Sequence, residues 1–257
     1  MRSRAPNQVE MKFPRWGGKR DGAGRPRGKS GRVRHGARPR LSAHTPVLVT
    51  MRTRFVTSIL REQMIFRAVR ALIARVSRGE TRVVHFSVQR DHMHLIVEAP
   101  DKLTLARRMQ GLASGVARLV NRALGRRLPF WNGRYHREDL RSPREVRNRL
   151  VYVLMNFRKH RADEAGTPTR ILDPFSSALW LDGWAPRAGP WVAALRRSSL
   201  FDGIEREDIP VRRPTKWLLT TGWKRHGLLL PTEAPRSART ASPSGGASSG
   251  TSRRVKD

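Results

Sequence analysis

The sequence has no cysteine, few acidic residues and no long apolar run. Without cysteine, disulfides, thiolate nucleophiles and thiolate metal sites are excluded. Because no stretch of 18 apolar residues occurs, a membrane-spanning helix is not expected, and the polar first thirty residues lack the apolar core of a secretory signal. We therefore expect an intracellular protein without a membrane partner.

Basic residues, in contrast, are abundant. Lys and Arg number 53 against 20 Asp and Glu, which gives a formal net charge of +33 at pH 7. Nucleic acid is the leading candidate partner, because Lys and Arg that neutralise phosphates release condensed counterions. The 257 residues, 38% of them hydrophobic, allow one main core. We expect a cytoplasmic protein that binds nucleic acid, nucleoid-associated if that nucleic acid is DNA, and that is a monomer or homodimer.

Both ends of the chain have a composition that is typical of unfolded segments. Residues 1–42 are rich in Lys, Arg, Gly and Pro and predict a flexible basic arm. Within it, residues 24–29 resemble an AT-hook, in which Arg25 and Arg27 would enter a narrow minor groove; a solvated basic tail is the alternative. Residues 232–257 are rich in Ser, Gly and Thr and predict a disordered tail.

Apolar periodicity predicts one α+β domain over residues 43–162. Strands are expected at 45–51, 84–88, 92–98 and 137–140, and helices at 62–76, 103–124 and 143–161. The last helix begins with a capping box of Ser142 and Glu145, with Pro143 at its first position. This order fits a ferredoxin-like antiparallel sheet with helices on one face, which leaves the other face for a ligand.

Residues 163–231 contain five of the seven tryptophans and many prolines. This composition predicts an ordered but irregular extension that packs on the core. The sequence of this segment indicates no function.

One predicted strand carries two histidines. The period of two along residues 92–98 sends His92 and His94 to the same face. Two neutral imidazoles on one face can reach one divalent ion. The pattern alone is short, and in a basic protein such a pair of histidines is more often incidental than a metal site.

The last predicted helix carries a tyrosine away from its apolar stripe. Val146, Leu150, Val153, Leu154 and Phe157 form the stripe, whereas Tyr152 lies on the opposite face of the helix. Asn148 and Asn156 flank Tyr152 one turn away in each direction. Tyr152 is thus either a nucleophile with a polar helper or a surface tyrosine on a solvated face.

Three motifs in this order resemble the HUH single-tyrosine transposases, and most closely the REP-associated tyrosine transposases. The resemblance spans about residues 44–160. Its motifs are the segment Gln-Arg-Asp-His-Met-His-Leu at 89–95, Phe-Trp-Asn-Gly-Arg-Tyr-His at 130–136, and Tyr-Val-Leu-Met-Asn at 152–156.

The resemblance implies a function and assigns roles to residues. It implies a single-stranded DNA endonuclease and strand transferase, active on single-stranded or hairpin DNA, that uses a divalent metal, Mg or Mn. His92, His94 and Asn156 would bind the metal, and Tyr152 would attack DNA to form a 5′-phosphotyrosine. Phe157 replaces the family's usual proline. Asp91 replaces its common asparagine and could be an extra metal ligand, a turn cap or neither; the turn cap is the favoured interpretation.

Several residues and functions remain open from the sequence. Tyr135, the only other tyrosine, is a rival nucleophile, although base stacking or packing suits its basic surroundings better. A catalytically inactive, domesticated DNA-binding protein of the same fold is the alternative function, and an RNA-binding module ranks last. A DNA backbone track is predicted from the basic side chains of Arg107, Arg108, Arg118, Arg122 and Arg134.

Overall fold

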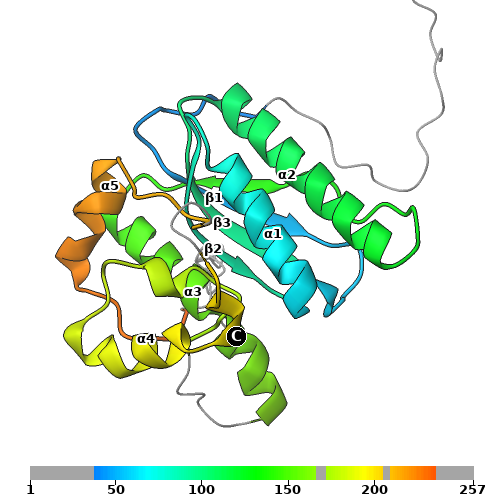
Figure 1. Ribbon diagram of the computed structural model, residues 1–257. Helices are drawn as coiled ribbons and strands as arrows, with labels where there is room; N and C mark the ends of the chain where they lie inside the picture. The colour runs from blue at the N-terminus through cyan, green and yellow to red at the C-terminus, as the bar shows by residue number, and fades with distance from the viewer. Residues whose placement is uncertain (1–37, 166–171, 205–208, 236–257) are drawn as a thin grey trace, which may run out of the picture. The chain divides into compact units, whose positions relative to one another are not determined.

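The computed structural model describes residues 38–165, 172–204 and 209–235, shown in colour in Figure 1. In the helix that begins at Pro143, it describes the side chains as far as Met155 and that of Phe157. The predicted AT-hook residues Arg25 and Arg27 lie outside the described residues, as does most of the predicted tail.

Four strands form one antiparallel sheet. They are β1 (Val47–Arg52), β2 (Arg82–Val88), β3 (His92–Glu98) and β4 (His136–Asp139), in the order β2-β3-β1-β4. This is the strand order of a ferredoxin-like sheet built from a βαββαβ chain. The predicted α+β antiparallel fold is confirmed.

Two helices cover one face of the sheet. They are α1 (Gln63–Val76), preceded by the short helix η1 (Ile59–Arg61), and α2 (Lys102–Ala123), and they lie side by side in Figure 1. The Asp101 side chain caps α2 by accepting hydrogen bonds from the backbone N–H groups of Leu103 and Thr104. The apolar stripes of both helices pack on the strand residues Val49 and Leu95 and form the larger core.

The third helix, α3 (Pro143–Ala165), packs on the opposite face of the sheet, which is a difference from the expected arrangement of helices on one face. Ser142 and Glu145 form the predicted capping box at its start. The physical reason for the packing is that this face is only partly polar. Leu48 and Ile96 make one end of it apolar, and the stripe of α3 buries that end.

The C-terminal extension, residues 172–235, packs against α3 and β2. It contains η2 (Ala178–Trp180), η3 (Pro186–Ala188), α4 (Gly189–Arg196), η4 (Ser199–Phe201), α5 (Trp217–Thr220) and η6 (Gly222–His226). The outer strand β2 forms backbone hydrogen bonds with it, from Val88 N–H to the Phe175 carbonyl and from Ser177 N–H to the Phe86 carbonyl, each 2.9 Å. The sheet domain and the extension therefore belong to one compact unit.

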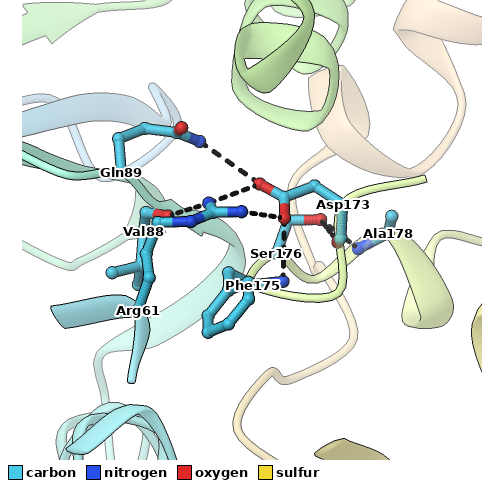
Figure 2. A network of polar contacts seen from close by, with 7 residues as sticks. All are labelled: Arg61, Val88, Gln89, Asp173, Phe175, Ser176 and Ala178. Atoms are coloured by element: carbon cyan, nitrogen blue, oxygen red, sulfur yellow. Dashed lines mark hydrogen bonds and ion pairs between the residues drawn. The ribbon is translucent and has the colours of Figure 1, made fainter. Parts of the chain in front are cut away.

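An ion pair between partly buried Arg61 and buried Asp173 joins the start of the extension to the sheet domain (Figure 2). Arg61 contacts both carboxylate oxygens of Asp173, at 2.9 and 2.8 Å, and donates to the Val88 carbonyl at 2.7 Å. The guanidinium also lies 4.2 Å from the centre of the Phe175 ring. The Asp173 side chain is 1% exposed, so the Arg61 guanidinium takes the place of water around its carboxylate.

None of the helices in the described part of the chain combines the length and apolar character needed to span a membrane.

Candidate active site

His92 and His94 lie next to each other on the sheet face that α3 covers. The register of β1 and β3 pairs Thr50 with His94 and Arg52 with His92, so these four side chains share the face. The two imidazole rings are 4.5 Å apart between centroids, and both residues are buried. They occupy the polar end of the face, beyond the apolar end that α3 buries.

Each histidine has an oxygen next to its Nδ1 atom. Nδ1 of His92 is 2.6 Å from Oδ1 of Asp91, and Nδ1 of His94 is 3.0 Å from the hydroxyl of Thr50. A carboxylate only accepts hydrogen bonds, so it fixes the proton of His92 on Nδ1 and makes Nε2 the acceptor nitrogen. The Asp91 side chain thus orients His92.

Tyr152 reaches these histidines from α3. Its ring centroid is 4.8 Å from that of His94, at an interplanar angle of 65°, and the side chain is half-buried. Tyr152 lies beside the apolar stripe because α3 is buried on two sides: the sheet covers the predicted stripe, and the extension helps to cover Val151 and Met155. The polar end of the sheet face receives the tyrosine.

Charges around Tyr152 act on its phenol in opposite directions. Burial raises the pKa of Tyr152 above its usual value of 10, the positive charges of Arg52 and Arg149 oppose that rise, and Glu138 and Asp91 add to it. Arg149 lies 5.8 Å from the centre of the Tyr152 ring and donates to Oε1 of Glu138 on β4 at 2.9 and 2.6 Å. The ion pair holds a guanidinium beside the tyrosine.

Sequence reasoning missed Arg52, Arg149 and Glu138 as neighbours of this site. Two signals were available: Arg149 precedes Tyr152 by three residues on the same helix, and Arg52 alternates with Thr50 along β1. The position of Glu138 needed the pairing of β4 with β1, which puts Glu138 opposite Leu48 on the histidine face.

The remaining predicted residues are Asn156, Tyr135 and the arginines of the basic track. The structure describes the helical backbone at Asn156 but not its side chain. Tyr135 packs against the core on the α1 and α2 side of the sheet, away from the histidines. The basic side chains of the predicted DNA track are exposed. Those on α2, across the sheet from Tyr152, are Arg107, Arg108, Arg118 and Arg122, and Arg134 lies in the loop before β4.

A metal could have two histidine ligands here. Within the described ranges, no group of three or more His, Cys, Asp or Glu side chains could hold a metal ion. Further ligands would therefore have to be amide, water or phosphate oxygens, which Mg and Mn accept.

Comparison with known proteins gives two matches. A solved structure of a REP-associated tyrosine transposase bound to a REP hairpin shares 19% sequence identity with this chain, and the match covers 57% of this chain and 83% of that one, with a TM-score of 0.44. No curated protein matches the sequence.

The other match is to a protein family. Residues 40–145 match the family described as IS200-like transposases, a segment that includes His92 and His94 and ends at Glu145, before Tyr152. This match confirms the transposase family assignment that the sequence motifs predicted. Residues 40–145 of this chain are thus similar to the IS200-like transposases, and the residues after Glu145 lie outside that match.

Proposed function

We propose that this protein is a single-stranded DNA endonuclease and strand transferase that forms a 5′-phosphotyrosine through Tyr152 and uses a divalent metal, Mg or Mn. The observation that carries this proposal is the convergence of Tyr152 with His94 and His92, which come from separate elements of the chain. A protein that only binds DNA has no physical need for this cluster.

The histidine pair fits a divalent metal. Metal-binding histidines commonly donate the second ring N–H to an oxygen, as His92 does to Asp91. His92 and His94 would hold the ion, with Asn156 and DNA phosphate oxygens as additional ligands. A bound divalent ion would stabilise the negative charge that develops on the phosphate oxygens.

The residues of this chain position and activate the nucleophile. Tyr152 Oη forms a bond to phosphorus while the bond from phosphorus to the 3′ oxygen breaks. The phenol proton passes to water, and the departing 3′ oxygen takes up a proton. Because burial disfavours the phenolate, the positive charges of Arg52 and Arg149 are needed to oppose that effect, and their guanidinium groups can also pair with phosphate.

The covalent product explains strand transfer without ATP. A 5′-phosphotyrosine retains the energy of the phosphodiester, and the free 3′-hydroxyl of a second strand can attack it. That attack restores the Tyr152 hydroxyl and joins the two strands, so cleavage and joining are the same reaction in opposite directions.

The test is a covalent adduct assay. The purified full-length protein is incubated with Mn or Mg and with labelled single-stranded hairpin DNA from the flanks of its own gene, and adducts are separated on denaturing gels. We expect an adduct with the wild type that disappears with a chelator and in Tyr152→Phe. Tyr135→Phe is the matched control, because it removes the only other tyrosine, and it should keep the adduct.

Two outcomes would contradict the proposal. If the adduct persists in Tyr152→Phe and disappears in Tyr135→Phe, the nucleophile is misassigned. If the hairpin DNA is bound but no adduct forms with either metal, the protein is the catalytically inactive DNA-binding alternative.

A further inference from the structure

A groove runs along the first half of α3 and ends at Tyr152. It has a volume of about 630 Å³, and its walls come from α3, from Glu138 on β4 and from residues 226–234 of the extension. A volume of this size is in the range of pockets that bind small organic ligands, which includes a nucleotide. Residues 226–234 lie beyond the part of the chain that matches the transposase family.

The extension wall of the groove is fixed to α3. Arg147 donates from Nε to the Gly227 carbonyl at 2.8 Å and from its two Nη atoms to the Glu233 carboxylate at 2.9 and 3.0 Å. Glu233 also accepts from the Leu230 N–H at 2.8 Å. The groove is therefore a built feature of the fold.

The carboxylates of the groove are all engaged. Glu233 pairs with Arg147, Glu138 pairs with Arg149, and Glu145 accepts from the backbone at the start of α3. Among the described residues, Arg144 has no carboxylate partner, and it lies exposed in the same groove as the exposed ring of His226. The groove is lined by as many glutamates as arginines, and Arg144 is the arginine of its lining whose guanidinium is open to an anion.

The groove also has an ordered row of polar side chains. Arg144, Asn148 and Tyr152 follow one another at intervals of four residues, so they line the same side of α3 over about 12 Å. The exposed Asn148 amide has both a donor and an acceptor, which matches the edge of an unpaired base, and Arg144 can pair with a phosphate.

We propose that this groove binds the unpaired nucleotide next to the phosphate that Tyr152 attacks, with Asn148 contacting the base edge and Arg144 the neighbouring phosphate. The inference rests on the proposed function, because Tyr152 fixes which phosphate is meant. It gives the extension a role in substrate binding, since His226 and the segment around Glu233 form one wall of the nucleotide site.

The test uses a set of hairpin oligonucleotides from the gene flanks. On each side of the cleaved phosphate in turn, the nucleotide is varied through the four bases, replaced by an abasic nucleotide or omitted. Adduct formation is measured with otherwise wild-type protein, and binding is measured by fluorescence anisotropy in a Tyr152→Phe background. Asn148→Ala and Arg144→Ala are each introduced separately, once into the wild-type protein and once into the Tyr152→Phe protein. Gln110→Ala and Arg78→Ala are the matched controls, since both side chains are exposed and lie on or next to the helices across the sheet.

We expect Asn148→Ala to reduce the preference among bases at one flanking position by about tenfold. Arg144→Ala should weaken binding severalfold for DNA that retains the flanking nucleotide and leave DNA without it unaffected. The two control variants should behave as the parent protein. Unchanged base preference in Asn148→Ala, or equal weakening by Arg144→Ala with and without the nucleotide, would overturn the inference.

The two proposals can fail separately. If the wild type forms the adduct but the groove variants bind and cleave as the parent does, only the nucleotide site is wrong. If no adduct forms but base preference in the Tyr152→Phe background depends on Asn148, the groove stands and the chemistry does not.

Discussion

Acid should destabilise this protein through His85, a buried residue of β2. Its Nδ1 lies 3.1 Å from the hydroxyl of Ser177 in the extension. Burial lowers the pKa of His85 from 6.5 to about 4, and the charge of Asp182 opposes that change only in part. The folded protein therefore holds His85 neutral at a pH where the unfolded chain has already taken up a proton.

The size of the effect follows from this difference in pKa. As the pH falls through 6.5, the unfolded state binds a proton and the folded state does not, so the free energy of unfolding decreases until about pH 4 and then levels off. From pH 7.5 the contribution lost is about 2 kcal/mol at pH 5 and about 3 kcal/mol at pH 4.

Urea unfolding followed by tryptophan fluorescence would measure the loss, because five of the seven tryptophans lie in the extension. The control is His85→Gln, whose amide can still bond to Ser177 but cannot titrate. The wild type should lose about 2 kcal/mol more than His85→Gln between pH 7.5 and 5. If the difference between the two proteins is independent of pH, the buried neutral histidine is refuted.

Three further predictions concern the extension and the metal. Asp173→Ala should lower the free energy of unfolding by about 3 kcal/mol in urea titrations, because it leaves the partly buried guanidinium of Arg61 without its counter-ion; a loss under about 0.5 kcal/mol would contradict this. Gly183→Ala should cost about 3 kcal/mol, since its Cβ would lie 2.1 and 2.3 Å from ring atoms of the buried Trp223. Gly189→Ala, whose Cβ meets nothing within 4 Å, is the control and should be tolerated in the same urea titrations. Mn at a hundredfold excess over its Kd should stabilise the protein by about 2.7 kcal/mol in thermal shift assays, and an equal shift in His92→Ala would exclude this site.

Local patterns were sufficient to predict the elements of the sheet domain. Alternation gave β3 at His92–Glu98 with the observed bounds, and the capping box placed the start of α3 at Pro143. These signals are local, because capping and apolar periodicity act within a few residues. The position of α3 on the second face was not predictable in the same way, since residues such as Val151 and Met155 are buried with help from a distant part of the chain.

The candidate site was predicted in part for the same reason. His92 and His94 share a face by strand period, and Tyr152 was singled out because helical periodicity puts it on the face opposite the apolar stripe. The partners that complete the site come from other elements: Thr50 from β1 and Glu138 from β4. Such contacts depend on strand order and register, which short sequence patterns do not specify.

The backbone pairing of β2 with the extension has a consequence for how this gene can be divided. β2 is an outer strand, and Phe175 and Ser177 occupy part of its hydrogen-bonding edge. A fragment that ended with the family match at Glu145 would leave that edge open, and without α3 it would also expose the apolar patch around Leu48 and Ile96. Open strand edges and exposed apolar faces lead to self-association. Recombination that exchanged the extension between relatives would have to carry both matching surfaces, so the two segments are expected to be inherited as one piece.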